Sequence, residues 1–580
     1  MTAFDLARPT HRALVDLVVD PECAAELKSR AVRWPSWTLS RRQLCDLGLL
    51  ASGAFSPLAS FLGQNDYLAV CGSMRLADGT LWPMPVTLDV TAHAFGTTAG
   101  QDRLALRDRE GVLVAVLERT QMWRPDRHAE AGQVFGTTDD SHPGVNHVLH
   151  ATHDWYVSGR LSVLSQPELP EHGVLTLTPR QVRAEFARRG WDRVVAFQTR
   201  NPLHRAHQQL TLRAAREADA RLLIHPVVGI GKPGDVAVRT RVRCYRAIMP
   251  SYPDGTAMLS LLPLAMRMGG PREALWHALI RGNYGATHFI VGRDHASPGA
   301  DAHGRPFYAP YEAQDLLAAH DTELEVKIVP FRRMVYRPDT DSYCADDEVP
   351  PGTVTRTISG TELRQRLAAG RALPTWFTPP AVAAELRRCY PAPAHRGLTV
   401  FFTGLSGAGK STIANHLCAS LEDRYGRNVT LLDGDVIRQH LSADLGFGRR
   451  DREENLRRVA FVAGEVTRHR GVAVCATIAP YAGIRADIRR TVEQYGGFVL
   501  VYVATPLDEC ERRDRKGLYA KARAGLLPQF TGVSDDFDEP EDADIVIDTQ
   551  VQSPAAAADS IIEHLGRLGY LPTRSKSGEC

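Results

Sequence analysis

One motif constrains the fold more than any other part of the chain: Gly404-Leu405-Ser406-Gly407-Ala408-Gly409-Lys410-Ser411-Thr412. It fits G-x-x-x-x-G-K-[ST], in which glycines let backbone N–H groups turn inward around phosphate oxygens. An apolar run at 398–402 precedes the motif, and a helical pattern follows at 413–421, so the required strand–loop–helix context is present. We therefore expect a parallel α/β domain that binds ATP through Gly404, Gly407, Ala408, Gly409, Lys410, Ser411 and Thr412, with Lys410 at the β- and γ-phosphates and Ser411 on Mg²⁺.

Length and composition limit what the rest of the chain can be. The 580 residues exceed what one hydrophobic core serves and suggest roughly three or four domains. A net charge of +2 argues against nucleic acid or a membrane as the main partner. The ten cysteines include no C-x-x-C pair, and no apolar run approaches the ~18 residues that span a bilayer. We expect small-molecule substrates, a cytoplasmic location and a homo-oligomer.

The first 165 residues show the pattern of a mixed, strand-rich domain. Residues 85–90 alternate with period two from Val86 onward, and short strands are expected at 104–108 and 111–117 around a turn. Ser40 is placed to cap a helix, and a tight apolar turn follows at 53–58. No catalytic role is assigned to this region.

The pattern changes near residue 166. Thr178 is expected to cap a helix that has Pro179 at its first position. A buried strand at 194–197, a polar loop at 198–207, a helix at 208–218 and a strand at 222–228 follow. This β-α-β order predicts a parallel sheet whose ligand lies at the carboxyl ends of the strands.

The polar loop at 198–207 carries candidate catalytic side chains. His204 and His207 are three residues apart, so at a helix start both rings face the same side. With Arg200 they suit an anion whose charge grows during a reaction. Two alternatives stay open: a zinc pair, although neither an H-E-x-x-H frame nor a third ligand is evident, and solvated loop histidines.

Two further polar segments could contact phosphate. Residues 292–299 follow a predicted strand at 288–291 and again place basic groups at a strand end. Residues 358–364 open a helix with hydroxyl groups, which suits either a phosphate contact or a simple helix cap.

Together, the segments 198–207, 292–299, 334–336 and 359–361 resemble the motifs of the ATP sulfurylase (sulfate adenylyltransferase) family, and 44–58 resembles its amino-terminal region. The resemblance covers roughly residues 1–385. It implies a PUA-like first domain, a nucleotidyltransferase domain of the H-x-x-H superfamily, and attack by sulfate on the α-phosphate of ATP with release of pyrophosphate. It also implies active-site roles for Thr199, Arg200 and Asn201, sulfate contacts from Gln198, Arg200 and Ala296, and ATP contacts from His204, His207, Gly292, Arg293, Asp294, His295 and Val335.

A Pro-rich linker at 389–397 leads into the domain of the phosphate-binding loop. A predicted strand at 429–432 ends at Asp433-Gly434-Asp435, where a carboxylate can act on Mg²⁺ or as a base toward a hydroxyl group. The basic residues of 451–458 could clamp a phosphate or sulfate, or could form a solvated helix face.

These blocks, with 516–519 and 529–532, resemble adenylylsulfate (APS) kinase over residues 398–570. Two departures from that family stand out: Val436 replaces a usual Asn, and Ala479 replaces a usual Ser that is often described as a phosphoserine intermediate. Phe447 and Phe530 would sandwich the adenine. The resemblance implies that APS is bound by Asp435, which is also the candidate catalytic base, and by Arg438, Phe447, Arg452, Asn455, Ile478, Lys516 and Phe530.

The two halves share an intermediate, so we expect a bifunctional enzyme that uses Mg²⁺ with ATP to convert sulfate to APS and then to 3′-phosphoadenylylsulfate (PAPS). The expected α/β multidomain chain has a PUA-like mixed β domain (1–165), a nucleotidyltransferase domain with a parallel sheet (166–388), the linker, and a P-loop kinase domain (398–580). One alternative is a non-catalytic, PAPS-sensing kinase-like domain, and another is a sulfurylase that runs in reverse. Intact Lys410, Ser411 and Asp435 favour a working kinase.

Alanine at position 479 predicts direct phosphoryl transfer, because it offers no nucleophile. If 477–479 continues a strand, Thr477 faces the same side as Ala479 but lies ~6–7 Å away, too far to substitute for a serine.

Overall fold

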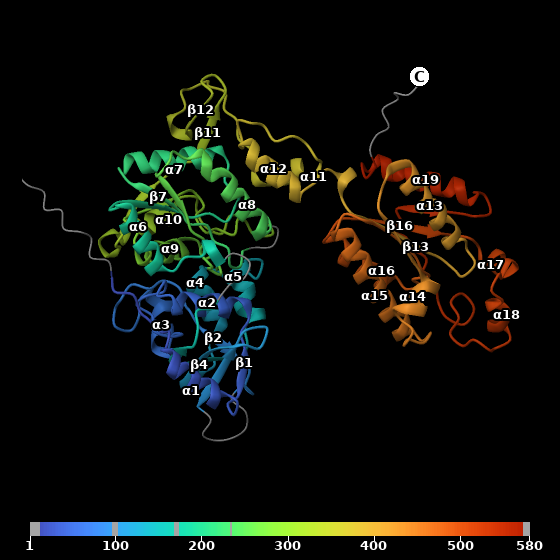
Figure 1. Ribbon diagram of the computed structural model, residues 1–580, viewed down its shortest axis with the longest axis horizontal. Helices are drawn as coiled ribbons and strands as arrows, with labels where there is room; N and C mark the ends of the chain where they lie inside the picture. Colours follow the sequence, from blue (N-terminus) through green and yellow to red (C-terminus); the bar gives the residue numbers. More distant parts are fainter. Residues whose placement is uncertain (1–11, 95–101, 168–172, 232–234, 572–580) are drawn as a thin grey trace, which may run out of the picture. The chain divides into compact units, whose positions relative to one another are not determined.

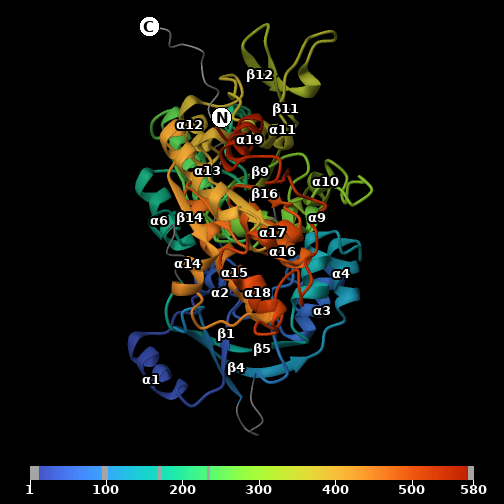
Figure 2. The ribbon, with the colours of Figure 1, turned by 90° about the vertical axis from the view of Figure 1, so that its right-hand side faces the viewer.

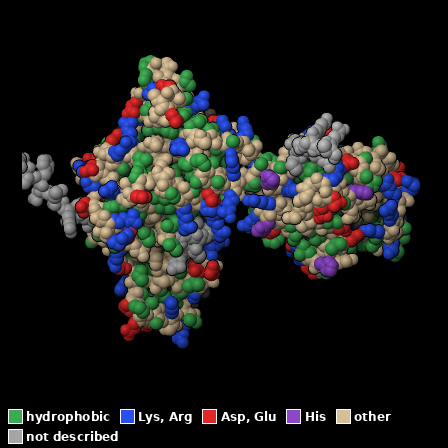
Figure 3. Space-filling view, turned by 45° about the horizontal axis from the view of Figure 1, so that its top comes forward, with side chains coloured by type: hydrophobic (Ala, Val, Ile, Leu, Met, Phe, Trp, Pro, Cys, Tyr) green, Lys and Arg blue, Asp and Glu red, His purple; other side chains and the backbone are tan. Residues whose placement is uncertain are grey.

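The structure is a computed structural model that describes residues 12–94, 102–167, 173–231 and 235–571 (Figure 1). The chain divides into two compact units, Met1–Ser359 with Leu373–Leu386, and Gly360–Ala372 with Arg387–Cys580. Within the described ranges, no helix combines the length and the apolar character needed to cross a bilayer. Figure 3 shows Lys and Arg side chains interspersed with acidic and apolar ones on the drawn face of each unit.

The first unit begins with a mixed five-stranded sheet in the order β1-β3-β4-β5-β2. Only the β1–β3 pair is parallel among its neighbouring strands. Figure 2 shows α1 beside β4 at one end of this unit. The strands are β1 (Ser36–Thr38), β2 (Leu88–Val90), β3 (Arg103–Arg107), β4 (Leu113–Trp123) and β5 (Trp155–Val163), and the helices are α1 (Pro21–Ala31), α2 (Arg41–Ala51), α3 (Gln64–Ser73), α4 (Arg127–Phe135), α5 (Pro143–Asn146) and the π-turn η1 (His147–Ala151).

A second sheet of the first unit is wholly parallel, in the order β10-β9-β6-β7-β8. Its strands are β6 (Val194–Phe197), β7 (Arg221–Ile224), β8 (Ala257–Leu259), β9 (His288–Val291) and β10 (Lys327–Pro330). The helices are α6 (Pro179–Arg189), α7 (Arg205–Glu217), α8 (Val238–Ile248), α9 (Gly270–Asn283), α10 (Glu312–Ala319) and α12 (Pro380–Cys389), with 3₁₀ turns η2 (Gly173–Leu175), η3 (Met249–Ser251), η4 (Asp321–Glu323) and η5 (Asp346–Glu348). An antiparallel hairpin follows, β11 (Met334–Arg337) and β12 (Ser342–Ala345).

One continuous apolar core joins the two sheets of the first unit. It includes Phe55, Trp82 and Trp276, whose rings stand 5.0–6.3 Å apart from centroid to centroid. Helix α9, which carries Trp276, is almost entirely buried. The parallel sheet therefore packs against the buried helix α9 through this shared core.

The second unit is a five-stranded parallel sheet in the order β14-β15-β13-β16-β17. Its strands are β13 (Leu398–Thr403), β14 (Val429–Asp433), β15 (Val472–Ala476), β16 (Gly497–Val503) and β17 (Ile545–Ile547). Its helices are α11 (Gly360–Ala368), α13 (Lys410–Tyr425), α14 (Gly434–His440), α15 (Arg449–Arg468), α16 (Ala482–Glu493), α17 (Leu507–Arg513), α18 (Leu518–Arg523) and α19 (Pro554–Arg567), with the turn η6 (Pro393–His395).

The central strand β13 explains why this sheet is covered on both sides. All six of its residues are buried, as expected for a parallel strand between two helical layers. Side chains on one face pack with α13 and α19, and those on the other pack with α15 and α16. The predicted strand at 398–402 and the α/β class are confirmed.

Local signals in the sequence place most elements correctly. Ser40 and Thr178 cap α2 and α6, as predicted, and the structure shows that each cap is part of a capping box with the glutamine three residues on. The strand predicted at 222–228 stops at Ile224, because Pro226 has no N–H to continue the ladder. The helix after the phosphate-binding loop runs longer than predicted, from Lys410 to a left-handed cap at Gly426.

The expected linker at 389–397 is bound to the second unit. Arg427 donates to Ala394 O (2.7 Å) and to Arg396 O (2.5 Å), and Arg396 donates to Leu367 O and Ala368 O of α11. Helix α11, which begins within the 359–361 segment, therefore packs within the second unit.

Candidate active sites

The first site forms where β6 and β9 end. These neighbouring strands are parallel, so the loops after them, 198–204 and 292–299, lie at the same edge of the sheet. The first loop is held by two residues of α8 that the sequence analysis missed. Arg241 donates to Arg200 O (2.9 Å) and to Val227 O (2.8 Å), and Tyr245 donates to Asn201 O (3.0 Å). These bonds hold the backbone of Arg200 and Asn201 in place.

His204 and His207 lie together at the start of α7, with ring centroids 5.9 Å apart, as their spacing predicts. The backbone N–H of His204 donates to Nδ1 of His207 (3.2 Å), so a neutral His207 carries its proton on Nε2 and can donate it outward. His204 Nδ1 is 3.0 Å from Thr378 Oγ1, and its ring stacks on Phe377 at 4.3 Å. Nothing in the sequence pattern indicated either partner.

Burial lowers the pKa of both histidines. The pKa of His204 falls to about 3, with His207 as a second cause, and that of His207 falls to about 4. At neutral pH they therefore act as neutral hydrogen-bond donors and not as cations. His204 is only 5% exposed, so the solvated-loop alternative does not apply to it.

Arg200 is the charged group of this loop, and it forms an ion pair with Asp235. Its Nη1 lies 2.8 and 3.0 Å from the two carboxylate oxygens of Asp235. The guanidinium is thus kept in place by an anion, and a bound sulfate would have to share it or displace the carboxylate.

The second loop carries an unusual backbone. Asp294 and Ala296 both adopt left-handed conformations, with φ of 54° and 55°, in which successive N–H groups can line a concave surface for an anion. Ala296 O accepts from Gly270 N (3.3 Å), which ties the loop to the start of α9. Gly292 and Arg293 lie at the start of this turn, and the exposed Arg293 contacts Asp294 at 3.2 Å.

A buried histidine joins the two loops. His277 of α9 lies with Nδ1 3.1 Å from His295 Nε2 and with Nε2 3.5 Å from Gln198 Nε2. Val335 is buried on β11, a strand that packs against α7. Within the described ranges there is no group of three or more His, Cys, Asp or Glu placed to hold a metal.

The second site is the phosphate-binding loop between β13 and α13. Gly404, Gly407 and Gly409 have φ of 142°, 76° and 108°, and a Cβ at Gly404 would lie 2.5 Å from Val503 O. Only glycine allows this path without strain. Hydroxyl groups of Thr505 and Thr549 donate to Ala408 O, and Tyr519 donates to Ser406 O. The sequence analysis missed these three supports.

Lys410 and Ser411 begin α13, as the motif requires. Lys410 Nζ donates to Gly404 O (2.9 Å) and Leu405 O (2.7 Å), and burial lowers its pKa to about 8. Ser411 Oγ donates to Asp433 Oδ2 at 2.6 Å, and Thr412 is exposed beside it. Asp433, at the end of β14, is thus the carboxylate that faces the loop.

Several of the residues implied in APS binding contact one another or the segments that carry them. Asp435 forms an ion pair with Lys516, and Arg438 stacks over the Phe447 ring at 4.3 Å. Arg452 donates to Phe447 O (2.7 Å), to Gln529 O and to Asp535 (2.9 Å). It therefore links the segments that carry Phe447 and Phe530. The solvated-face alternative for 451–458 does not hold for this arginine.

Two more of these residues are Asn455, which is buried, and Ile478, which is partly buried. Asn455 is 6% exposed and its Oδ1 has no hydrogen-bond partner in the described part of the chain. Ile478 O accepts from Gly404 N (3.3 Å) and from Thr403 Oγ1 (2.6 Å), which attaches it to the start of the phosphate-binding loop.

The expected strand through 477–479 is wrong. Strand β15 ends at Ala476, and Ala479 is left-handed with φ of 44° because its carbonyl turns to accept from Arg485 (2.9 Å) and Thr403 (3.1 Å). The Ala479 side chain is 1% exposed and packs in the core beside α15 and α16. Thr477 and Ala479 are therefore not related by the spacing of a strand, but position 479 still offers no nucleophile.

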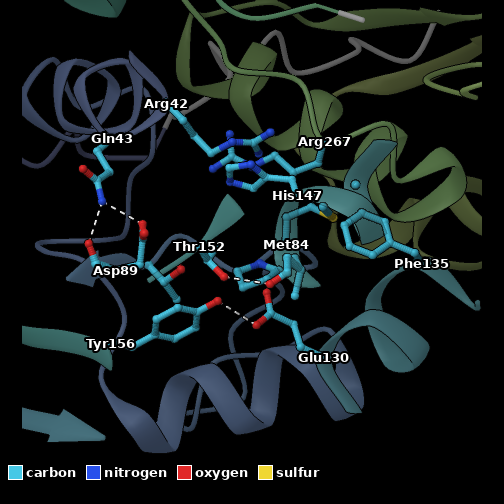
Figure 4. Close-up of a pocket in the computed structure, with 14 residues that line it drawn as sticks. Arg42, Gln43, Met84, Asp89, Glu130, Phe135, His147, Thr152, Tyr156 and Arg267 are labelled. Carbon is cyan, nitrogen blue, oxygen red and sulfur yellow. Dashed lines mark hydrogen bonds between the residues drawn. The ribbon is translucent and has the colours of Figure 1, made fainter. Parts of the chain in front are cut away.

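The structure also reveals a polar cavity of about 40 Å³ in the first unit that the sequence did not indicate (Figure 4). Arg42, Arg267 and His147 lie together on one side of it, and Glu130 lies on the other. Glu130 accepts from Tyr67 (3.0 Å) and Tyr156 (2.9 Å), and burial raises its pKa to about 7.

Family models match three consecutive stretches of the chain: a PUA-like domain at 7–166, ATP-sulfurylase at 174–389 and adenylylsulphate kinase at 396–548. A sulfate adenylyltransferase of Phaeosphaeria nodorum is 48% identical over 572 residues, covering 98% of this chain and 100% of that protein. One of Mycosarcoma maydis is 50% identical over 561 residues, covering 96% and 98%. The solved structure of a hexameric APS kinase from Thiobacillus denitrificans is 35% identical, covers 98% and 100%, and superposes with a TM-score of 0.79.

The fold and the two loops define an ATP-dependent transferase with two nucleotide sites. The chain belongs to the sulfate adenylyltransferase (ATP sulfurylase) family. It carries an ATP-sulfurylase domain and an adenylylsulfate kinase domain, which supply the two steps of sulfate activation, from ATP and sulfate to APS and from APS to PAPS.

Proposed function

We propose that each step is carried out by its own complete site, at the loop after β6 for APS synthesis and at the phosphate-binding loop for APS phosphorylation. The observation that carries this proposal is that each unit places a strand–loop–helix at the carboxyl edge of its own parallel sheet, with polar groups fixed by neighbouring helices. The hydrogen bonds described above that hold the backbone of each loop come from side chains of the same unit.

At the first site, a sulfate oxygen attacks the α-phosphorus of ATP, and the bond to the bridging oxygen of pyrophosphate breaks. Arg200, Gln198 and the turn at Ala296 hold sulfate, while Thr199 and Asn201 shape the loop that presents it. His204, His207 and the segment 292–295 contact ATP, with Val335 packing nearby. Neutral imidazole donors stabilise charge that spreads over the phosphate in the transition state.

At the second site, the 3′-hydroxyl of APS attacks the γ-phosphorus of a second ATP, and ADP leaves. The P-loop backbone and Lys410 hold the β- and γ-phosphates. Ser411 Oγ and Asp433 Oδ2 are oxygen donors 2.6 Å apart, a set that fits Mg²⁺, which supplies charge neutralisation when bound with ATP. The predicted metal role of Ser411 thus extends to Asp433.

Asp435 is the candidate base that takes the 3′-hydroxyl proton. Its partner Lys516 comes from a different segment, so APS can bind Lys516 through its anionic groups and leave Asp435 available. Arg438, Arg452 and Asn455 lie around the nucleotide, Ile478 lines the loop, and the Phe447 and Phe530 rings enclose the adenine.

Transfer is direct, without a phosphoenzyme. Ala479 has no nucleophile and its side chain lies in the apolar core. Phosphoryl transfer depends on positioning and charge neutralisation, which the loop, Lys410, Ser411 and Asp433 supply without covalent catalysis.

The competing function is a kinase-like domain that only senses PAPS. Ala479 and Val436 favour it, whereas the intact Lys410 and its loop geometry favour catalysis. One assay distinguishes them: purified protein is given ATP, radiolabelled sulfate and pyrophosphatase, and labelled APS and PAPS are separated over time. Our proposal expects APS first and PAPS as the final product. Accumulation of APS without PAPS would assign the second unit to regulation.

A further inference from the structure

Three polar residues lie on one face of the largely apolar helix α9: Glu273, His277 and Arg281, at four-residue intervals. Each has a relative exposed area of 0%. Burying such groups is unfavourable unless partners hold them, so their partners indicate their role. The reactions described above make no use of them.

His277 lies between groups of both substrate loops. Its Nδ1 is 3.1 Å from His295 Nε2, and its Nε2 is 3.4 Å from Glu273 Oε1 and 3.5 Å from the side-chain amide of Gln198. Glu273 is itself anchored, because its two oxygens accept from the backbone N–H groups of Arg267 (2.9 Å) and Gly269 (3.0 Å). A fixed carboxylate therefore orients a histidine that contacts both loops.

The protons of this network follow from its charges. Burial would raise the pKa of Glu273, but the hydrogen bonds from His277 and the two backbone groups lower it, so it is a carboxylate. Burial lowers the pKa of His277, so its ring is neutral with one N–H. A carboxylate only accepts, so that proton lies on Nε2. Nδ1 then accepts from His295 Nε2.

The proton on His277 Nε2 also determines which way the side-chain amide of Gln198 is turned toward its ligand. The Gln198 Oε1 atom is buried without a partner among the described residues, while its Nε2 faces the nitrogen of His277 that carries the proton. Turning the amide by 180° places Oε1 beside the His277 N–H, which it then shares with Glu273, and leaves the NH₂ group to donate elsewhere. Sulfate has only acceptor oxygens, so an NH₂ group suits it and an amide oxygen does not.

We propose that His277, held by Glu273, is the positioning residue that makes Gln198 present its amide NH₂ group to sulfate and that keeps the proton of His295, a residue of the proposed ATP subsite, on Nε2. This rests on the proposed role of the first site. His277 would thereby set the polarity of both subsites through its two ring nitrogens.

Two substitutions test the roles of the two ring nitrogens of His277 separately. His277→Gln keeps an amide N–H near the position of Nε2, and His277→Asn keeps an amide oxygen near the position of Nδ1. Both are made in full-length protein that also carries Lys410→Ala, which weakens ATP binding at the second site. KM for sulfate is measured by pyrophosphate release, and ATP affinity is measured by calorimetry without turnover. His225→Asn and His225→Gln are the matched controls, since His225 is equally buried but neither of its ring nitrogens has a hydrogen-bond partner among the described residues; Arg281 contacts only its backbone carbonyl.

We expect His277→Asn to raise KM for sulfate roughly 10-fold or more and to leave ATP affinity within ~3-fold. His277→Gln should weaken ATP binding and leave KM for sulfate nearly unchanged. In the His225 variants, neither quantity should change more than the other. Equal losses for both substrates in both variants, or no change in either, would overturn the proposal. A parent enzyme that turns over no sulfate would instead overturn the proposed function, and the ATP affinities would still decide the role of His277.

Discussion

The two proposed nucleotide sites bind anionic groups with different parts of the chain. Both lie after a central strand of a five-stranded parallel sheet, and both open a helix. The second uses backbone: three glycines at positive φ and a buried lysine at a helix start. The first uses side chains: neutral histidines, a paired arginine and a glutamine, held by α8, α9 and the 375–378 segment.

That difference changes how each site responds to its environment. Backbone N–H groups do not titrate, so ATP phosphate binding by the 404–412 loop depends on one cation, Lys410. The first site keeps its histidines neutral by burying them, and its charge rests on Arg200 with Asp235. We therefore expect the sites to fail separately and to respond differently to pH.

Lys410→Ala should have the largest effect. The lysine is the one cation of the loop positioned for the β- and γ-phosphates, so PAPS formation from supplied APS should fall roughly 10³-fold or more. Pyrophosphate release from ATP and sulfate should stay within ~2-fold, because the first site lies in another unit. Loss of both activities in a folded variant would contradict the claim that the two sites act independently.

His204→Ala and Arg200→Ala should each reduce APS synthesis ~10²–10³-fold, since each removes one donor to the transition state. Kinase activity on supplied APS serves as the internal control for folding and should be unchanged. Near-normal APS synthesis in either variant would give that residue a structural role only.

The pH profiles of the two activities should differ. His204 and His207, with pKa values lowered to about 3 and about 4, stay neutral above roughly pH 5 and should produce no limb near pH 6.5 in APS synthesis. Lys410, with a pKa lowered to about 8, loses its charge as pH rises. Kinase kcat/KM for ATP should therefore fall about tenfold for each unit well above pH 8.

Either of two results would contradict these expected pH profiles. The first is a bell-shaped pH profile of APS synthesis whose acid limb lies near pH 6.5 and is lost in His204→Ala. That result would show that His204 acts as a cation. A kinase kcat/KM for ATP that is flat from pH 7 to 10 would show that Lys410 keeps its charge.

Ala479→Ser should have the smallest effect, below ~3-fold on kinase activity, because direct transfer needs no nucleophile there. The wild type and the variant are incubated with γ-labelled ATP, with and without APS, and denatured. Label should reach PAPS while none stays on wild-type protein. Stable label on the wild type that chases into PAPS would contradict direct transfer.

The contrast between the sites also explains what the sequence could predict. The phosphate-binding loop is local, because its glycines, Lys410 and Ser411 are adjacent in the chain and their geometry follows from residue type. The β-α-β frame and the adjacency of His204 and His207 were likewise readable from periodicity and spacing. Family resemblance supplied the remaining candidate residues.

The supports of the first site were not readable, because they are tertiary. Thr378 lies 174 residues from His204, and Arg241 lies 41 residues from Arg200. The one signal that was available is the four-residue spacing of Glu273, His277 and Arg281 in an apolar helical stretch. At Ala479, the strand pattern misled because tertiary hydrogen bonds turn the chain after Ala476.

The most direct test of two complete, independent sites is complementation. Lys410→Ala protein, which should make only APS, is mixed with His204→Ala protein, which should only phosphorylate it, and PAPS is measured from ATP and labelled sulfate. Each variant alone should form little PAPS, and the mixture should form it after a lag while APS builds up in solution. A mixture that releases APS yet forms no more PAPS than either variant alone would contradict the account.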